Sequence, residues 1–400
     1  MQRAEVELRE NILPFWIKHT GDETRGGFYG EITNDLVVHS EAPRGSLLTS
    51  RILWTYSAAY RRYQNTAYRA MADRAYEDLL TRFWDQEYGG LYWMVAADGT
   101  PIREQKQLYG QAFGIYGLSE YFGATGMQDA LDKAREIYAA MEQHSYDPEH
   151  GGYFEARNRT WQPAEEMRLS PVDLNVAKSM NTHLHIMEAY ANLLRVWPDP
   201  GLRSRLIELL QLMMNRIIDP DTYQMTLFFD AAWNPRSVNV SYGHDIEASW
   251  LLVESTGIAG DPELDAEARD IAVRMAQTVY DEGLDSDGAL IYEAGPDGDV
   301  DTTKQWWPQA EAAVGFLNAY QLSGEQHYLE AAAASWDFIE EHLIDHEYGE
   351  WLRYVKRDRS PGADEAKVSF WKCPYHNGRA CMELTERAHQ LLKDLHQDQA

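Results

Sequence analysis

The chain has 400 residues, of which 64 are Asp or Glu and 36 are Lys or Arg, so its formal net charge is −28. Hydrophobic residues make up 44% and aromatic residues 12%, and a chain of this composition can bury a large core, which excludes global disorder. The negative charge opposes contact with polyanions, so we expect neither nucleic acid nor an acidic membrane surface as a partner.

A turn motif recurs along the chain at intervals of about 60–70 residues. In its clearest form an Asp is followed four residues later by Gly-Gly and then by an aromatic or apolar pair, as in Asp22…Gly26-Gly27-Phe28-Tyr29. The six copies, three of them degenerate, begin at Asp22, Asp85, Asp147, Asp219, Asp287 and Asp345. Glycine permits the positive φ that such a turn requires, so each copy predicts a tight turn followed by a short strand.

Helical patterns fill the intervals between these turns, two in each interval. The i, i+3, i+4 spacing of apolar residues is plain at Leu206, Leu209 and Leu210. Helices are predicted at 4–19, 46–62, 67–84, 107–122, 128–143, 174–196, 201–217, 241–256, 265–281, 308–322, 326–343 and 375–394. About twelve helices in six pairs predict an all-α fold, the (α/α)6 barrel, with six parallel inner helices, six outer helices and short β-hairpins in the loops. Because no linker rich in Pro, Gly or Ser interrupts the pattern, we expect residues 1–400 to form a single catalytic domain.

The cysteines and the first residues bear on the cellular compartment. Cys373 and Cys381 would lie about 12 Å apart along one helix, farther than the roughly 7 Å between Cα atoms that a disulfide allows. Residues 1–7 are polar and acidic, with no apolar signal core, and no apolar run approaches the roughly 18 residues of a membrane span. We therefore expect a cytoplasmic protein that does not enter a membrane.

The N-termini of parallel inner helices meet at one end of such a barrel, so the chemistry is expected there. Three of these helix starts carry a histidine, His185, His244 or His376, and we predict that these histidines are catalytic. His183 lies about 200° around the helix from His185, so the two cannot share a metal ion, and we predict a structural role for His183. His244 and Glu247 share a helix face, but no second half-site matches them, so we predict no metal site.

Two further groups of residues at the helix starts leave alternatives open. Arg51 lies in an otherwise apolar helix, where a guanidinium must either pair with a buried acid such as Glu247 or line a polar cavity. Trp306, Trp307 and Trp371 are either core aromatics or surfaces on which a sugar ring stacks.

Four segments resemble the N-acylglucosamine 2-epimerase superfamily and, within it, the cellobiose 2-epimerases. They are SRILW at 50–54, MNTHLH at 180–185, YGHDIEASWLL at 242–252 and WKCPYHNGR at 371–379. The resemblance covers essentially the whole chain, and the strings YGHDIEA and PYHN are more typical of the disaccharide epimerases than of the N-acetylhexosamine enzymes.

The resemblance implies an (α/α)6 barrel and a cofactor-free conversion of the reducing-end glucose of a β-1,4-linked disaccharide into mannose, by inversion at C2. It implies that His244 and His376 exchange the C2 proton. The implied lining of the sugar cleft is Arg51, Tyr109, Asn181, His185, Glu247, Trp306, Trp307, Glu311 and Trp371. The expected partner is a small oligosaccharide such as cellobiose, lactose or mannobiose, and the expected state is a monomer.

The predicted chemistry suits these residue types. The C2–H bond becomes acidic only after the sugar ring opens to an aldehyde, and removal of the proton then leaves an enediolate. Imidazoles can take and return this proton because both their forms exist near neutral pH. We predict that Arg51 stabilises the enediolate oxygen, that Glu247 orients or tunes a neighbouring group, and that His185 assists ring opening. No step requires a metal ion or a nucleotide.

Three other functions remain open at the level of the sequence. An aldose–ketose isomerase of the mannose isomerase type would use the same histidines and return the proton elsewhere. An inverting glycoside hydrolase would need two carboxyl groups about 6.5–9.5 Å apart, for which Glu247 and Glu311 are candidates, but it would leave the histidines without a role. The third alternative is a sugar-binding protein without catalytic activity.

Overall fold

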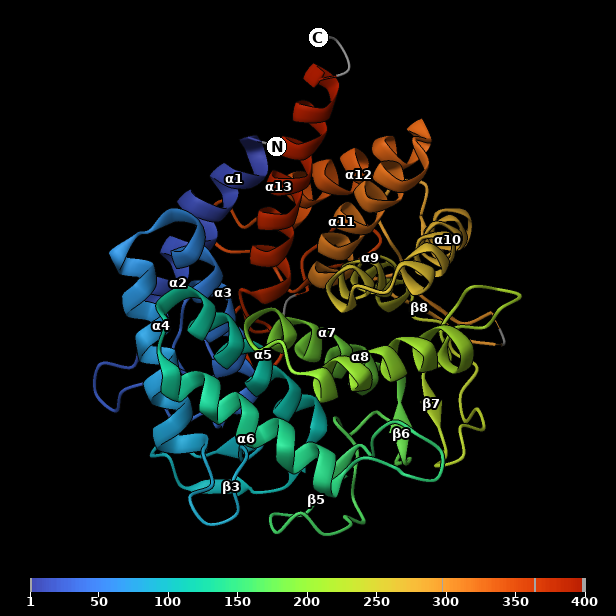
Figure 1. The fold of residues 1–400 in the computed structure, drawn as a ribbon. Coiled ribbons are helices and arrows are strands. Elements are labelled where there is room, and N and C mark those ends of the chain that lie inside the picture. Colours follow the sequence, from blue (N-terminus) through green and yellow to red (C-terminus); the bar gives the residue numbers. More distant parts are fainter. Residues whose placement is uncertain (1, 297, 363–364, 398–400) are drawn as a thin grey trace.

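Helices arranged in two concentric rings make up most of this computed structural model, which describes residues 2–296, 298–362 and 365–397 (Figure 1). The inner ring consists of α3 (Ser46–Tyr63), α5 (Leu108–Thr125), α7 (Met180–Val196), α9 (Tyr242–Ala259), α11 (Trp306–Ser323) and α13 (Tyr375–Gln397). The outer segments are α1 (Gln2–Val6) with η1 (Glu7–Ile12) and α2 (Leu13–His19), α4 (Thr66–Asp78) with η2 (Leu79–Phe83), α6 (Gln128–His144), α8 (Pro200–Leu212) with η3 (Met213–Ile217), α10 (Pro262–Thr278) with η4 (Val279–Gly283), and α12 (Gln326–Phe338) with η5 (Ile339–Leu343). The η segments are π-helical turns that continue the preceding helix.

The inner ring is closed. Each inner helix packs against the next one along the chain, and α13 returns to pack against α3. Each inner helix from α3 to α11 also packs against the outer helix that follows it, whereas the partner of α13 is the first helical segment, α1 and η1. This is the predicted (α/α)6 barrel. No helix in the described part of the chain is long and apolar enough to cross a membrane.

Burial explains the division between the two rings. Every residue of α5 from Leu108 to Tyr121 is buried, which is the pattern of a helix surrounded by others on all sides. The outer helix α6 instead buries one stripe, which includes Ala130, Ala134, Ile137 and Met141, and exposes charged residues on its other face.

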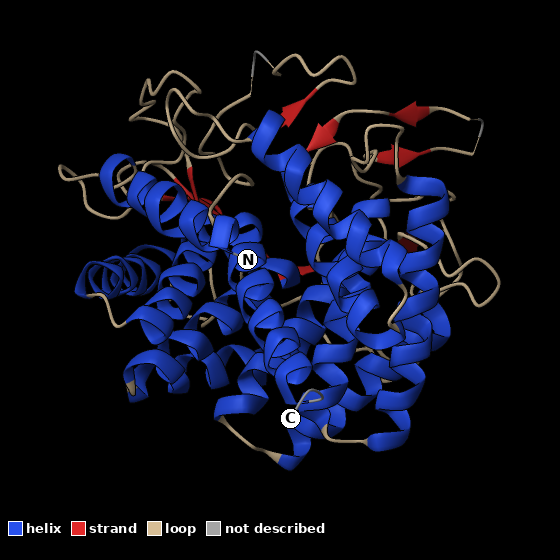
Figure 2. Cartoon of the chain, turned by 90° about the horizontal axis from the view of Figure 1, so that it is seen from above, coloured by secondary structure: helices blue, strands red, loops and turns tan. Residues whose placement is uncertain are grey.

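Short strands and long loops gather on one side of the helical ring, as Figure 2 shows. Antiparallel pairs join neighbouring repeats: β1 (Arg44–Gly45) with β2 (Met94–Val95), β4 (Lys106–Gln107) with β5 (Ala156–Arg157), β6 (Lys178–Ser179) with β7 (Phe228–Phe229), and β10 (Lys304–Gln305) with β11 (Tyr354–Val355). The predicted hairpins are present as β2 with β3 (Pro101–Arg103) and as β8 (Glu293–Ala294) with β9 (Val300–Asp301). Single bridges between Val240 and Ala294 and between Ile32 and Val368 complete the sixfold pattern.

Each predicted turn is anchored by its aspartate. In the first copy, Asp22 Oδ1 accepts hydrogen bonds from the backbone N–H groups of Thr24 and Arg25, both at 2.9 Å. The second carboxylate oxygen binds a buried cation at the start of the next inner helix in five copies, through the pairs Asp22–Arg44, Asp85–Lys106, Asp147–Lys178, Asp285–Lys304 and Asp345–Lys367. The prediction for the fifth copy was therefore two residues out of place, because Asp285 is the closer partner of the lysine, at 3.1 Å against 3.9 Å for Asp287. Asp287 supports the same turn by accepting from Ala289 N at 3.2 Å.

The third repeat contains an insertion. Its aspartate and its lysine are 31 residues apart, whereas the separation is 19 to 22 residues in the other four pairs. The added residues lie between β5 and β6, and part of them was wrongly predicted to be helical, since α7 begins at Met180 and not at residue 174. The helix starts there because the Ser179 side chain caps it by accepting from Thr182 N.

The fourth residue of four inner helices binds the preceding turn. Gln111 and Gln309 each accept from a turn N–H, at 2.9 and 2.8 Å, and each donates back to the carbonyl of the same turn residue at 2.8 Å. His183 accepts from Tyr153 N at 2.9 Å, and Asp245 accepts from Met225 N at 2.9 Å. These side chains hold each turn against its helix.

Asp245, the fourth residue of α9, holds its turn with a carboxyl group, whose protonation depends on pH. Its Oδ2 has no hydrogen-bond partner among the described residues, and burial raises its pKa to about 8. In the unfolded chain it ionises near pH 4. The stability contributed by the neutral carboxyl is therefore fully present below about pH 4 and is lost as the pH rises toward 8.

Asp245→Asn supplies an N–H donor without charge. We expect it to raise Tm by about 2–4 °C at pH 8 and by less at pH 5, as measured by scanning calorimetry. An equal shift at both pH values would contradict this account.

Candidate active site

A cavity of about 740 Å³ opens at the end of the barrel where the inner helices begin. Its volume lies within the range of small-molecule sites. Ten of the predicted site residues line it: Arg51, Tyr109, Asn181, His185, His244, Glu247, Trp306, Trp307, Trp371 and His376. Glu311 does not line the cavity, and it lies behind His376, with which it forms a hydrogen bond.

Helix geometry brings these residues together. Tyr109, Asn181 and Trp307 are the second residues of α5, α7 and α11, and Arg51 and Glu247 are the sixth residues of α3 and α9. Second and sixth positions lie on the same face of a helix, one turn apart. The fourth position points instead to the turns, which is why His183 is absent from the lining although it is two residues from His185.

Two of the three predicted catalytic histidines are oriented by carboxylates. His185 Nδ1 lies 2.9 Å from Glu188 Oε2, and His376 Nδ1 lies 2.7 Å from Glu311 Oε1. An ionised carboxylate accepts a hydrogen bond from Nδ1–H, so the hydrogen-bond network assigns the tautomer whose Nε2 carries a lone pair. The Nδ1 atom of His244 lies 2.8 Å from Ser241 Oγ.

Burial keeps the histidines neutral. It lowers the pKa of His244 to about 3 and that of His376 well below its usual value, and the charges of Arg51 and other nearby cationic groups act in the same direction. The pKa of His185 is also lowered by burial, although Glu188 opposes this. Neutral imidazoles can accept a proton, and any imidazolium formed here is a strong proton donor.

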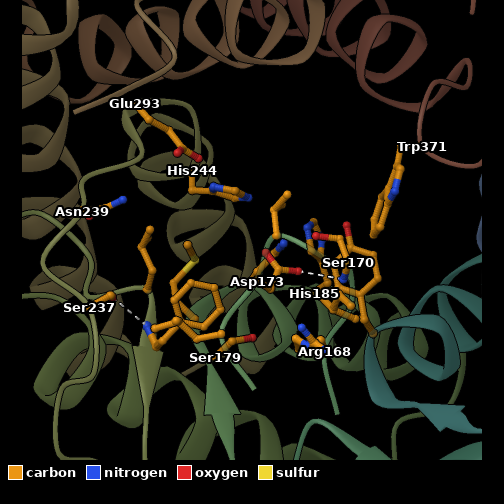
Figure 3. Close-up of a pocket in the computed structure, with 18 of the residues that line it drawn as sticks. Arg168, Ser170, Asp173, Ser179, His185, Ser237, Asn239, His244, Glu293 and Trp371 are labelled. Carbon is orange, nitrogen blue, oxygen red and sulfur yellow. Dashed lines mark hydrogen bonds between the residues drawn. The ribbon is translucent and has the colours of Figure 1, made fainter. Parts of the chain in front are cut away.

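Aromatic rings contact the histidines. Trp307 is close to both His244 and His376, with ring centroids 4.6 and 5.5 Å away. Tyr109 lies edge-on to His185 at 5.0 Å and to Trp371 at 5.9 Å. In Figure 3, His244 and Trp371 enter the cavity from different sides.

Arg51 does not form the ion pair considered as one alternative from the sequence. Its Nη2 donates to the Tyr109 hydroxyl at 2.7 Å, and its guanidinium lies over the rings of Phe113 and Tyr375, at 4.3 and 4.9 Å. Among the described residues, no carboxylate lies within ion-pair distance of it. Its charge is therefore available to an anionic group in the cavity.

Arg379 binds three buried carboxylates below the cavity. Its Nη1 donates to Glu188, and its Nη2 lies 2.6 Å from Glu247 Oε1 and 2.8 Å from Glu311 Oε1. Glu247 was predicted to tune a neighbouring group, and its contacts are with Arg379 and, at 3.9 Å, with His376 Nδ1. The carboxylate that orients His376 directly is Glu311.

The three carboxylates differ in their protonation. Burial and the neighbouring charge of Glu311 raise the pKa of Glu247 to about 8. Burial would also raise the pKa of Glu188, but Arg379 and His185 outweigh it and lower the value to about 2. The cluster therefore holds a neutral carboxylic acid beside a carboxylate at neutral pH.

A metal ion does not suit the cluster. Glu247, Glu311 and His376 offer ligand atoms within 4.8 Å of one another. However, Arg379 Nη2 already makes hydrogen bonds to both carboxylates, so the guanidinium occupies the place that a cation would take.

Several polar atoms of the cavity lining make no hydrogen bond to the described residues. Among the described residues, Arg51 Nε, Asn181 Oδ1, Glu247 Oε2 and Trp306 Nε1 are buried without a hydrogen bond. Buried polar groups are ordinarily paired, so these atoms suit a ligand rich in hydroxyl groups.

Sequence reasoning did not select Glu188, Arg379 or the rim of the cavity. Glu188 shares a helix face with Asn181 and His185, and Arg379 follows His376 by three residues, so helical spacing was an available signal for both. The rim is formed largely by the insertion of the third repeat, including Arg168, Ser170 and Asp173, which Figure 3 labels. That segment has no periodic pattern from which its place could be predicted.

His183→Gln provides a test of the division between His183 and His185. Glutamine already fills the same place in α5 and α11, so its Oε1 is expected to accept from Tyr153 N in the variant. We expect H183Q to retain at least about half of the wild-type kcat/KM, and H183A to lose about 1–3 kcal/mol of stability because the turn N–H loses its acceptor. Activity assays and urea unfolding check this, and a tenfold loss of kcat/KM in folded H183Q would show that His183 takes part in the chemistry.

Comparisons with known proteins identify the family of the chain. Residues 27–379 match the N-acylglucosamine 2-epimerase (GlcNAc 2-epimerase) family. The chain is 45% identical to the cellobiose 2-epimerase of Bacteroides fragilis over 384 residues, which cover 96% of this chain and 98% of that protein. The structure of cellobiose 2-epimerase from Bacillus thermoamylovorans is similar, with a TM-score of 0.93, 39% identity and coverage of 96% and 98% of the two chains. A D-mannose isomerase, 22% identical with a TM-score of 0.85 over 96% and 97% of the two chains, shows the shared fold alone. The resemblance predicted from the sequence is thus confirmed, and the chain belongs to the N-acylglucosamine 2-epimerase family as a carbohydrate epimerase of the cellobiose 2-epimerase type.

Proposed function

We propose that this epimerase inverts C2 of the reducing-end glucose of β-1,4-linked disaccharides, converting cellobiose to glucosyl-mannose and lactose to epilactose. The observation that carries the proposal is that His185, His244 and His376 line one cavity together with Arg51, a guanidinium that no described carboxylate pairs. Relatives that are 45% and 40% identical to this chain over 96% and 95% of its length are named cellobiose 2-epimerases, which supports the substrate class.

The proposed reaction begins with ring opening. His185 exchanges a proton at O1 or O5, which exposes the C1 aldehyde. Glu188 holds the imidazole by its Nδ1, so Nε2 is the atom that takes part.

Proton transfer at C2 follows. One of His244 and His376 removes the C2 proton, and the electron pair of the broken C–H bond passes into the enediolate, whose oxygen Arg51 stabilises. The other histidine returns a proton to the opposite face of C2, and the ring closes. The two histidines come from different inner helices, α9 and α13, and both contact Trp307 of α11, an arrangement that suits access to both faces. The net change is an isomerisation and needs no co-reactant.

Substrate binding is proposed for the remaining lining residues. Trp306, Trp307 and Trp371 offer flat faces to pyranose C–H groups, and Tyr109 and Asn181 offer hydrogen bonds to hydroxyls. All these groups come from one chain, so a monomer is sufficient for the reaction.

The hydrolase alternative is weakened by the carboxylates. Glu247 and Glu311 present ligand atoms within 4.8 Å of each other, closer than the separation of about 6.5–9.5 Å in inverting glycosidases, and Glu311 does not line the cavity. The mannose isomerase alternative shares the histidines, so only product analysis distinguishes it.

NMR product analysis in D2O tests the proposal. The enzyme is incubated separately with cellobiose, lactose, β-1,4-mannobiose, mannose and N-acetylglucosamine. We expect the C2 epimer of each disaccharide, with deuterium at C2. Fructose from mannose without change in cellobiose would establish the isomerase instead, release of glucose from cellobiose would establish a hydrolase, and absence of deuterium exchange from every sugar would indicate a binding protein.

A further inference from the structure

Glu350 occupies a backbone position that glycine takes in the other well-formed turns. It stands at the second glycine of the turn motif, where Gly27, Gly90 and Gly152 have φ of +64°, +69° and +74°. Its own φ is +61°. A residue with a Cβ is disfavoured in this left-handed conformation, and such residues cluster at functional sites.

The sixth repeat has room for this side chain. A Cβ at Gly90 would lie 2.8 Å from Gln111 Oε1, and one at Gly152 would lie 2.7 Å from His183 Nε2. The α13 residue that faces the sixth turn is Asn377, which is shorter than either. The Glu350 side chain extends toward α13, in the place where Gln111 and His183 reach the turns of the second and third repeats.

The Glu350 carboxylate is completely buried and fully engaged. Its Oε1 accepts from Lys372 Nζ at 2.5 Å and from Asn377 Nδ2 at 2.7 Å, and its Oε2 accepts from Trp16 Nε1 at 2.8 Å. The ion pair with Lys372 is additional to the Asp345–Lys367 pair, which corresponds to the pairs of the other repeats.

Both partners of Glu350 on the C-terminal segment adjoin residues of the proposed site. Lys372 follows Trp371, and its Nζ also lies 5.4 Å from the Trp306 ring. Asn377 follows His376, whose Nδ1 binds Glu311. A single carboxylate therefore binds one side chain just before α13 and another in its first turn.

We propose that Glu350 is a positioning residue, which places Trp371 through Lys372 and His376 through Asn377. The inference rests on the proposed function of Trp371 in sugar binding and of His376 in proton transfer. It predicts that the two contacts of Glu350 have separate effects. Loss of the contact with Lys372 weakens substrate binding, and loss of the contact with Asn377 slows proton transfer.

The test compares kcat and KM for cellobiose in four single variants of the full chain. Lys372→Met is expected to raise KM about tenfold with little change in kcat. Asn377→Ala is expected to lower kcat about tenfold with little change in KM, and Glu350→Gln to change both. Lys367→Met is the matched control. Lys367 lies five residues before Lys372 and pairs with Asp345 of the same turn, so the variant also removes a buried lysine charge. We expect it to lower Tm as K372M does without altering either constant per folded molecule.

The outcomes separate the inference from the proposed function. Wild-type enzyme that leaves cellobiose unchanged contradicts the proposed function, whatever the variants do. Active wild-type enzyme overturns the positioning role if K372M and K367M have equal effects, or if kcat and KM per folded molecule are unchanged in K372M and N377A, so that only the amount of folded protein falls. If K372M does not fold, the double variant E350Q/K372M removes both charges, and an unchanged KM in that variant overturns the role equally.

Discussion

His376→Ala is expected to lower the rate of C2 inversion by about 10²–10⁴-fold, the usual contribution of a general acid–base group. His376 lines the cavity, its Nδ1 is held by Glu311, and its pKa is lowered by burial. The imidazole is thus fixed as a neutral base with Nε2 free. His244→Ala is expected to have an effect of the same size, because inversion by two bases fails when either is absent.

Isotope exchange sharpens this prediction. In each variant the remaining histidine still faces one side of C2, so it can remove a proton and return a deuteron on that side. We expect each variant to exchange the C2 hydrogen of one epimer with D2O without converting it, and the two variants to differ in which epimer they exchange. Inversion near the wild-type rate in either folded variant would contradict the assignment, and exchange of both epimers by one variant would favour a single base acting on a rotated intermediate. H183Q is the matched control on a histidine outside the cavity.

Arg379→Met is expected to destabilise the protein by about 3–5 kcal/mol, since it leaves buried carboxylates without their cation. Its guanidinium is 2% exposed and contacts Glu188, Glu247 and Glu311. Arg387→Met is a suitable control, because Arg387 lies on the same helix and pairs with Glu383 at 3.0 Å in a less buried setting, where loss of the pair is expected to cost less than about 1 kcal/mol.

The pH dependence of the Arg379 variant has a definite sign. In the wild-type protein the pKa of Glu188 is about 2, below its unfolded value, so the carboxylate stabilises the fold above about pH 4 and this contribution is lost as the pH falls toward 2. Without Arg379 the buried carboxyl groups ionise less readily than in the unfolded chain, so the variant loses stability as the pH rises. Urea unfolding should therefore show a larger gap between wild type and R379M at pH 8 than at pH 5. A gap that is independent of pH would show that the cost comes from lost packing and not from charge.

The fold was largely predictable because its signals are local and repeated. The Asp-Gly-Gly turns and the apolar periodicity each extend over about ten to twenty residues, and six repetitions make the ring the natural arrangement. The prediction failed where one repeat departs from the others. The inserted segment before α7 contains the apolar residues Leu174 and Val176, which were included in the predicted helix although they line the cavity.

The lining of the site was predictable from the helix starts, whereas the support behind it was not. Glu311 belongs to the expected set but lies behind His376, because its partner Arg379 is brought to it by the closing of the ring. The contact joins residues 68 positions apart in sequence, and helical spacing carries no information about such a pairing. The role of Glu350 was equally hidden in the sequence, since only the folded turn shows that its carboxylate contacts Lys372 and Asn377 near the start of α13.

The pairing of α13 with the first helical segment has a consequence for biosynthesis. The sixth helix pair combines the earliest and the latest parts of the described chain, and the bridge between Ile32 and Val368 joins the same two regions. A nascent chain can stack its first five repeats as they leave the ribosome, because their contacts are between neighbours. It exposes an open edge until α13 arrives, and His376 and Arg379 arrive with it. Closure of the ring and assembly of the proposed catalytic groups are thus expected to be one late event, so we expect a chain arrested before α13 to have neither a sealed core nor a complete site.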